Sequence, residues 1–415
     1  METGNPQKET NLHIEKLSIE IESLNLNSNT IGLTLIGVYL SLLLVQLVRN
    51  VISWTTWSFL ELVLIFLSSL VLFMLDYIVT GYSICIFGLF HHWSCLPQHY
   101  ISVENKAILV TGCDRGIGYE LAKKLDSMGY HVFAGCLFKG QKGEQSLVAD
   151  CSTRLQTLQM DVRNREQVKQ AAIQVQAKLG HNKLWAVINN AGICYIGNIE
   201  IMSTDDIENV MAINYMGPIN VCRAFLPLIR RSKGRLVNVA SNAGLAPIPH
   251  MGVYCASKAA LATFSESLRY ELEQWGVKVS TIVPSGYKTG ILAYDKTAAA
   301  ERWWKSASQT VKDDFGKECF TPEFKYENHE SSTTPDLSPI VNTIVMAVSV
   351  KNPQPFYYSG FLARTLPFVY LHLPSILQEP VMKLLGHWFN FKPEALKQCD
   401  KNDRSNKRFK LGKVH

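Results

Sequence analysis

The sequence predicts an α/β fold with a doubly wound parallel sheet, preceded by a helical membrane anchor. From residue 106 onward, short apolar runs alternate with segments of helical periodicity, as in a parallel sheet covered on both faces. The first of these runs leads through a glycine-rich turn directly into a helix. Residues 31–95, by contrast, are almost uninterruptedly apolar, which is typical of membrane-spanning helices.

The chain has 415 residues, of which 47% are hydrophobic and 18% charged, and residues 31–95 hold most of the hydrophobic excess. Positions 31–48 carry no charge, and eighteen helical residues span about 27 Å, close to the thickness of a bilayer core. Further apolar runs cover 51–75 and 77–93, with Glu61 and Asp76 between or within them. We therefore predict a polar segment over 1–30 and an anchor of two or three transmembrane helices over 31–95.

The catalytic domain is predicted over residues 104–360. Strands are expected at 107–111, 131–137, 155–161, 184–192, 234–241, 277–284 and 354–358. Helices are expected at 116–129, 164–180, 207–232, 253–276 and 339–350. The irregular stretch 286–335 is expected to be a functional lid. An apolar segment over 361–395, either lying on the membrane or covering the domain, and a basic tail over 396–415 complete the chain.

The glycine-rich turn is the first candidate ligand site. Glycines let the backbone approach a pyrophosphate, and the free N–H groups at a helix start attract its charge, so the turn predicts dinucleotide binding in a Rossmann fold. The residues of this turn are Thr111, Gly112, Asp114, Arg115, Gly116, Ile117 and Gly118. Asp161 with Val162, and Asn189 with Ala191 and Gly192, follow two later strands at the edge where such sheets bind ligands.

Tyr254 and Lys258 form the sharpest chemical signal. Side chains four residues apart share one helix face, and an adjacent ammonium favours phenolate, so we expect it to lower the tyrosine pKa. Ser241 ends the preceding strand, where its hydroxyl could meet the same substrate oxygen. The same motif on a surface helix would be an ordinary tyrosine–lysine pair.

Taken together, these motifs resemble the short-chain dehydrogenase/reductase family, over about residues 106–358. Within it, LWAVINNAG, FLPLIRRSKGRLVNVAS and ELEQWGVKVSTI are similar to the membrane-bound hydroxysteroid and retinol dehydrogenases, the 17β-hydroxysteroid enzymes in particular. The resemblance implies that Tyr254 is the general acid/base, that Ser241 polarises the substrate oxygen, and that Lys258 lowers the tyrosine pKa and binds the nicotinamide ribose. It further implies that Asn214 holds a water in a proton relay.

The resemblance also assigns the cofactor residues. Asp161 would contact adenine, Asn189 would line the cofactor cleft, and Thr289 would contact the nicotinamide amide. The turn after the sixth strand, Pro284-Ser285-Gly286, has Ser285 where the family usually has glycine. No acid ends the second strand, and Arg115 and Lys139 favour NADP slightly, whereas the closer resemblance favours NAD; the cofactor is therefore NAD or NADP.

These features predict an enzyme of lipophilic alcohols or ketones, such as steroids or retinoids, held in membrane lipid. An integral membrane protein of the endoplasmic reticulum, with a cytosolic catalytic domain and a homodimeric assembly, is expected from the resemblance. A dehydrogenase of a small hydroxy acid, with Arg302 or Lys305 binding the carboxylate, and a non-catalytic nucleotide-binding scaffold are the alternatives. We expect no metal site from the scattered cysteines and no nucleic-acid binding from the charge pattern.

Overall fold

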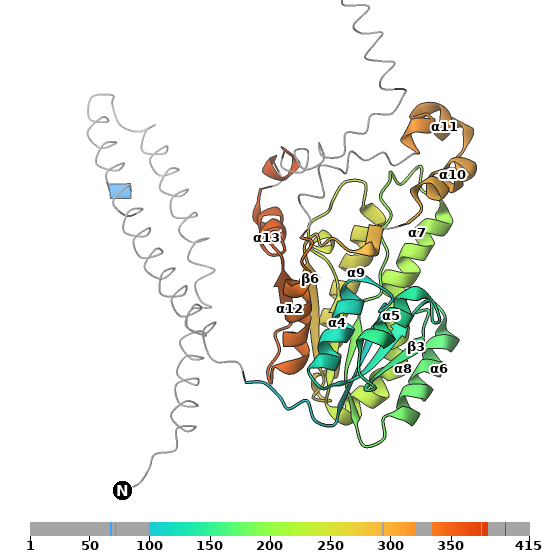
Figure 1. Cartoon of the computed structure of the whole chain (residues 1–415). Coiled ribbons are helices and arrows are strands. Elements are labelled where there is room, and N and C mark those ends of the chain that lie inside the picture. The colour runs from blue at the N-terminus through green and yellow to red at the C-terminus, as the bar shows by residue number, and fades with distance from the viewer. Residues whose placement is uncertain are drawn as a thin grey trace, which may run out of the picture. The chain divides into compact units, whose positions relative to one another are not determined.

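The computed structural model describes residues 99–292, 294–320, 334–374 and 376–380, together with positions 67, 68, 71 and 395 (Figure 1). The chain divides into two compact units, Met1–Pro97 and Gln98–His415, and the fold below is that of the second. The predicted polar segment 1–30, nearly all of the predicted anchor and the basic tail lie outside the described residues. Among the helices that are described, none is both long and apolar enough to cross a membrane.

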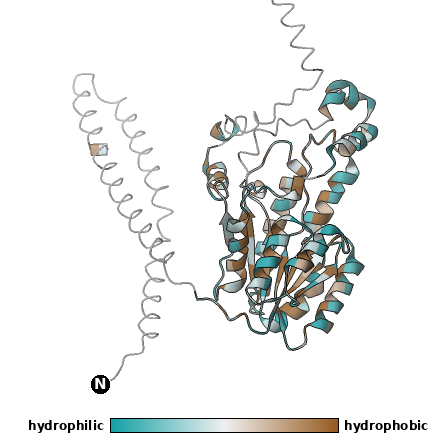
Figure 2. Cartoon of the chain, in the orientation of Figure 1, coloured by the Kyte–Doolittle hydropathy of each residue, from teal (hydrophilic) through white to brown (hydrophobic). Residues whose placement is uncertain are grey.

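Seven parallel strands form one sheet in the order β3-β2-β1-β4-β5-β6-β7, which is the doubly wound arrangement that the sequence predicts. The strands are β1 (Lys106–Thr111), β2 (His131–Cys136), β3 (Leu155–Gln159), β4 (Lys183–Asn189), β5 (Arg235–Val239), β6 (Lys278–Pro284) and β7 (Phe356–Ser359). The central strands are buried along almost their whole length because helices cover both faces (Figure 2).

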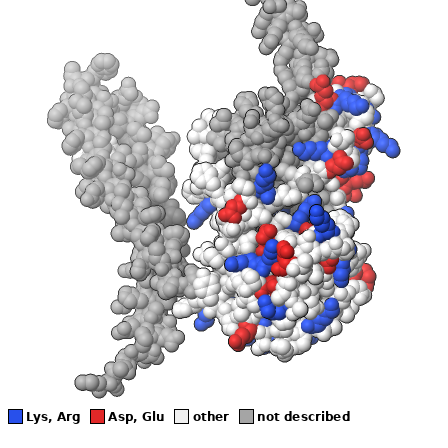
Figure 3. Space-filling view, in the orientation of Figure 1, with Lys and Arg blue, Asp and Glu red and all other residues white. Residues whose placement is uncertain are grey.

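Each face of the sheet has its own hydrophobic core. Helices α4 (Gly116–Ser127), α5 (Lys142–Asp150) and α12 (Ser338–Ser349) pack on one face, where Leu121 and Ile344 are fully buried. Helices α6 (Arg165–Lys178), α8 (Gly217–Ser232) and α9 (Gly252–Glu273) pack on the other, around Phe225. On the face seen in Figure 3, lysines and arginines are interspersed with acidic residues.

Three local predictions need correction. The helix expected over 207–232 is divided into α7 (Thr204–Met211), a π turn (Ala212–Met216) and α8, and such π turns often lie at functional sites. The stretch 286–335 is only partly irregular, since it contains α10 (Lys296–Ser306) and α11 (Gln309–Phe315) around a small core centred on Trp303. Helix α5 was not predicted, and its short, weakly apolar sequence explains why.

Beyond β7 the chain continues into α13 (Thr365–His372). The apolar residues of this helix are not confined to one face, so packing one face against the domain cannot bury all of them. Phe361 is 91% exposed and Phe368 61% exposed. Exposed apolar side chains therefore gather in the described segment that follows β7.

Candidate active site

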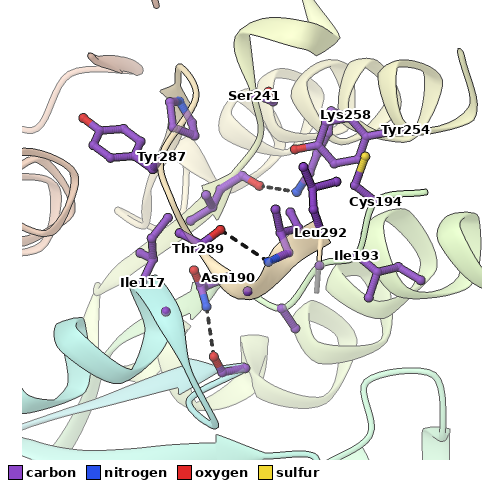
Figure 4. A pocket seen from close by; sticks show the side chains of 18 of the residues that line it. Ile117, Asn190, Ile193, Cys194, Ser241, Tyr254, Lys258, Tyr287, Thr289 and Leu292 are labelled. Atoms are coloured by element: carbon purple, nitrogen blue, oxygen red, sulfur yellow. Dashed lines mark hydrogen bonds between the residues drawn. The ribbon is translucent and has the colours of Figure 1, made fainter. Parts of the chain in front are cut away.

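A cavity of about 630 Å³ opens at the carboxyl ends of the central strands, where doubly wound sheets bind their ligands. One end is formed by the glycine-rich turn and by the residues that follow β2 and β3. The other end is formed by the residues that follow β4, β5 and β6, by the start of α9 and by the segment after β7. Figure 4 shows side chains from several of these elements converging on one space.

The glycine-rich turn fits a nucleotide because its conformation excludes side chains. Gly112 has φ +71°, and an added Cβ would lie 2.9 Å from the Cα of Ala191. A Cβ on Gly118 would lie 2.1 Å from the carbonyl oxygen of Gly112. Gly116, the first residue of α4, also has a positive φ, +63°. Bare backbone therefore faces the cavity at a helix start, which is the arrangement that holds a pyrophosphate.

Most of the predicted site residues line this cavity. They are Gly112, Asp114, Arg115, Gly116, Ile117, Asp161, Val162, Ala191, Gly192, Ser241, Tyr254, Lys258, Pro284, Gly286 and Thr289. Four others do not reach its wall: Thr111, Gly118, Asn189 and Asn214. Thr111 instead ties β1 to β4, because its hydroxyl accepts from the N–H groups of Asn190 and Ala191 at 3.1 Å each. Gly118 supports the turn from within α4.

Asn189 does not line the cleft as predicted. Its side chain is buried in the sheet, where Nδ2 donates to Oδ1 of Asn238 at 2.8 Å. The next residue, Asn190, reaches the cavity, and its Nδ2 donates to the carbonyl oxygens of Thr111 and Gly112 at 2.9 and 3.2 Å. Successive residues at a strand end point in opposite directions, so only one of the two asparagines can face the ligand.

Tyr254 and Lys258 lie together on α9, with the lysine Nζ 5.8 Å from the centre of the tyrosine ring (Figure 4). Nζ donates to the carbonyl of Val239 at 2.8 Å, which fixes the ammonium at the end of β5. Ser241 begins the next turn, and its Oγ accepts from the N–H of Ala243 at 3.2 Å. Phenol, ammonium and serine hydroxyl thus gather at one part of the cavity wall.

The predicted lowering of the Tyr254 pKa is not what this structure gives. Burial raises the pKa of the phenol well above its ordinary value, while hydrogen bonding with Ser241 lowers it. Burial also lowers the pKa of Lys258, to about 8. Both shifts have the same cause, since a dry cavity disfavours phenolate and ammonium alike. Hydrogen bonding with Ser241 is the interaction that favours the charged tyrosine against this effect of burial.

Asn214 lies behind the cavity in the π turn and is completely buried. Its Oδ1 accepts from the N–H of Ile193 at 2.9 Å, and its Nδ2 donates to the carbonyl of Ile193 at 2.9 Å and to Oγ of Ser257 at 3.0 Å. Ser257 in turn donates to the carbonyl of Tyr254 at 2.7 Å. Asn214 therefore joins the loop after β4 to the helix that carries Tyr254 and Lys258.

Charged side chains of the cavity cluster at the glycine-turn end. Asp161 forms a 2.6 Å ion pair with Arg163, which holds the pKa of Asp161 below its usual range. Arg163 lines the cavity as well, and sequence reasoning missed it because a surface arginine after a strand carries no distinctive signal. Arg115 lies against the backbone of Gly290, since a Cβ there would be 2.7 Å from its Nε.

The opposite end of the cavity is apolar. Ile193, Ile248, Met251, Leu292 and Leu362 are among the residues that line it there. Cys194, also missed from the sequence, lies beside Tyr254 and is a buried free thiol. Its pKa is raised by burial, so it behaves as a small apolar group.

The two cations suggested for binding a carboxylate lie elsewhere. Arg302 pairs with Asp206 at 3.1 Å, and Asp206 also accepts from the indole Nε1 of Trp303 at 2.8 Å. Neither Arg302 nor Lys305 lines the cavity. Among the described residues that line the apolar end, Lys258 is the only cationic one, and its Nζ is engaged by Val239.

The family model for "short chain dehydrogenase" matches residues 106–299, which include the glycine turn and the Tyr254–Lys258 pair. A mouse relative, estradiol 17-beta-dehydrogenase 2, is 39% identical over 315 residues, which cover 74% of this chain and 81% of the relative. The chain belongs to the short-chain dehydrogenase/reductase family. It is an NAD(P)-dependent oxidoreductase that interconverts hydroxyl and keto groups.

Two further comparisons place the chain within the family. It is 37% identical to rat mitochondrial D-beta-hydroxybutyrate dehydrogenase over 265 residues, which cover 62% of this chain and 77% of that protein. A solved short-chain dehydrogenase from Burkholderia cenocepacia J2315, in complex with NADP, superimposes with a TM-score of 0.52 at 24% identity. The match covers 68% of this chain and 99% of that structure, and it supports the fold.

Proposed function

We propose that this oxidoreductase acts on the hydroxyl or keto group of a lipophilic molecule, such as a steroid or retinoid, at a membrane. The observation that carries the proposal is the composition of the cavity. A phenol and a serine hydroxyl, Tyr254 and Ser241, lie at the apolar end of this cavity. Such a pocket favours a large apolar substrate with one oxygen at the reacting carbon. The similarity to estradiol 17-beta-dehydrogenase 2 points the same way.

In the proposed mechanism, the bound nicotinamide supplies the hydride chemistry, and the protein binds, orients and moves a proton. The glycine turn, Gly112 to Gly118, would hold the pyrophosphate, and Asp161 with Val162 the adenine. Thr289 would meet the nicotinamide amide and Lys258 its ribose. These positions follow the cavity wall from its charged end to its apolar end.

Tyr254 would remove the hydroxyl proton during oxidation and return it during reduction. Ser241 would hold the substrate oxygen and, through its hydrogen bond, keep the phenol closer to its charged form. Lys258 can pass a proton onward because burial brings its pKa to about 8. Asn214 would keep the Ile193 loop in place and support a water between Lys258 and solvent.

Membrane association is part of the proposal. The exposed apolar residues of α13, together with Phe361 and Leu362, adjoin the cavity. Phe361, Leu362 and Leu366 also line it. A lipid surface at this position would deliver an apolar substrate directly to the pocket. We further propose an endoplasmic-reticulum protein with a cytosolic catalytic domain, anchored by residues 31–95, and a homodimer formed through α8 and α9.

A dehydrogenase of small hydroxy acids is the second candidate, favoured by the similarity to D-beta-hydroxybutyrate dehydrogenase. A carboxylate substrate needs a cation in the pocket. Arg302 is bound to Asp206 outside the cavity, so Lys258, which the proposed mechanism assigns to the nicotinamide ribose, is the only cation among the described residues that line the apolar end. This arrangement favours the lipophilic substrate. The complete set of Tyr254, Lys258, Ser241 and Asn214 likewise disfavours a non-catalytic scaffold.

A substrate panel tests the proposal. The full chain in detergent or lipid vesicles should oxidise a 17β-hydroxysteroid or all-trans-retinol, or reduce the corresponding carbonyl compounds, with NAD(H) or NADP(H). 3-Hydroxybutyrate should be a poor substrate. Tyr254→Phe should lower kcat by about 10³-fold while nucleotide affinity stays near that of the unmodified protein. Turnover of 3-hydroxybutyrate alone, or full activity of the phenylalanine variant, would refute the corresponding part of the proposal.

A further inference from the structure

The end of β2 lacks the acid that commonly binds the cofactor ribose in NAD-dependent Rossmann enzymes. The residues at this point are Cys136, Leu137, Phe138 and Lys139, none of which is acidic. A carboxylate is nevertheless present there, because Asp114 reaches across from the glycine turn. Its Oδ2 accepts from the N–H of Leu137 and its Oδ1 accepts from the N–H of Phe138, each at 2.9 Å.

This contact leaves the carboxylate able to bind a ligand. Each carboxylate oxygen can accept two hydrogen bonds, and each receives one from the backbone. Asp114 and the neighbouring Leu137 and Phe138 all line the cavity. The remaining acceptor capacity is therefore available at the place where a ribose hydroxyl is expected.

The backbone of Asp114 is also closely packed against its neighbours. A Cβ on Gly143, at the start of α5, would lie 2.3 Å from the carbonyl oxygen of Asp114. The preceding residue, Cys113, donates its N–H to the carbonyl of Gly135 in β2 at 3.0 Å. The backbone on both sides of the aspartate is thus packed against β2 and α5, which fixes where the carboxylate lies.

The cations that suggested NADP are directed away from this carboxylate. Arg115 lies against Gly290, on the loop that also carries Thr289. The Nζ of Lys139 is 3.5 Å from the carbonyl oxygen of Thr157 on the neighbouring strand, and Lys139 is not part of the cavity wall. Lys142, at the start of α5, lines the cavity as Arg115 and Arg163 do, and it enters the test below because it lies on the helix that packs against Asp114.

We propose that Asp114 makes this enzyme selective for NAD(H) over NADP(H). A ribose 2′-hydroxyl can donate a hydrogen bond to the free side of the carboxylate. A 2′-phosphate would meet a negative charge, and the two backbone N–H groups that could bind it are already occupied by Asp114. The inference rests on the proposed placement of the nucleotide in this cavity, and it is independent of which alcohol is oxidised.

Binding measurements without any substrate test the selectivity directly. Titration of the full chain in detergent micelles, followed by NADH or NADPH fluorescence, should give a Kd for NADPH at least about tenfold above that for NADH. Asp114→Asn removes the charge but keeps the size of the side chain. It should lower the ratio of the Kd for NADPH to the Kd for NADH by about tenfold, or invert it. Glu120→Gln, an equal loss of charge on the exposed side of α4, should leave the ratio unchanged.

Two more measurements keep the test decisive if the aspartate variant folds poorly. On the unmodified protein, adenosine 2′,5′-bisphosphate should displace NADH at least about tenfold less well than adenosine 5′-monophosphate does. Lys142→Gln should weaken NADH and NADPH binding equally. Tighter NADPH binding by the unmodified protein, or a loss confined to NADPH in the Lys142 variant, would overturn the proposal. A protein that binds neither nucleotide would instead refute the proposed site.

Discussion

The ammonium of Lys258 donates to the backbone carbonyl of Val239 at 2.8 Å, so helix α9, which carries the proposed catalytic pair, is bound directly to the end of strand β5. The lysine is only 3% exposed and forms no ion pair with a carboxylate of the described residues, and this burial lowers its pKa to about 8. A buried cation without a counterion reduces the stability of the fold. The proposed catalytic arrangement therefore lowers the stability of the fold.

Lys258→Met should stabilise the nucleotide-free protein while abolishing activity. In the unfolded chain the lysine keeps its ordinary pKa of 10.5, so between pH 8 and 10.5 the unfolded state binds more protons and stability rises with pH. The destabilisation is complete below pH 8, at up to about 3 kcal/mol. Thermal unfolding should show a higher Tm for the variant at pH 7 and a smaller difference at pH 10. An equal difference at both values would contradict the assignment.

Ser241→Ala should change the pH dependence of catalysis. Hydrogen bonding with Ser241 lowers the pKa of Tyr254, so its removal raises that pKa further. In the proposed mechanism, oxidation of the alcohol needs the phenolate form of Tyr254. In a plot of log kcat/KM for oxidation against pH, the rising limb of the curve should therefore move to higher pH. The variant should also be less active. Ser241→Thr keeps a hydroxyl and should retain the original limb. A lower rate with an unmoved limb would mean that the serine only positions the substrate.

Asn238→Ala should destabilise the fold. Asn238 is fully buried, accepts from Nδ2 of Asn189 at 2.8 Å and donates to Oγ of Ser265 in α9 at 2.7 Å. Its loss leaves the buried Nδ2 of Asn189 with only the weak acceptor Sγ of Cys222, at 3.6 Å, which costs about 2 kcal/mol. Urea unfolding should show this decrease, while Gln176→Ala on the exposed side of α6 should have little effect. A decrease below about 0.5 kcal/mol would contradict a structural role for the asparagine pair.

Gly360→Ala should be severely destabilising, and Ser285 should determine part of the effect. Gly360 has φ +100°, and a Cβ would lie 1.9 Å from Oγ of Ser285, the residue that stands where the family usually has glycine. Ser285→Gly removes this clash but leaves the strained backbone. A double-mutant cycle should therefore give a smaller loss of Tm for Gly360→Ala in the Ser285→Gly background. Strictly additive effects would show that the two residues do not interact.

Most of the fold could be predicted because apolar periodicity and the glycine turn depend on local sequence. A doubly wound parallel sheet covered on both faces follows from these signals and from the handedness of the crossovers. The π turn around Asn214 could not be predicted, since the apolar pattern continues through it. Helix α10 was missed because it buries its apolar residues in a separate small core rather than on the sheet.

At the site, the types of residue could be predicted more readily than the directions in which their side chains point. Asn189 and Asn190 are identical neighbours, and only the phase of β4 decides which of them faces the cavity. Arg302 looked available for a carboxylate because its partner Asp206 is 96 positions away. The contact between Asp114 and the end of β2 likewise joins residues 23 and 24 positions apart, and no local pattern reveals it.

The residues that line the cavity range in sequence from Gly112 to Leu366, so segments from almost the whole described domain contribute to it. During translation the nucleotide end can assemble early, whereas the last wall appears only when the segment after β7 has left the ribosome. A chain that ended before that point would have Tyr254 and Lys258 in place, but the cavity would lack the wall formed by Phe361, Leu362 and Leu366. Genetic truncations near the carboxyl terminus should consequently damage catalysis even where every catalytic residue has been synthesised.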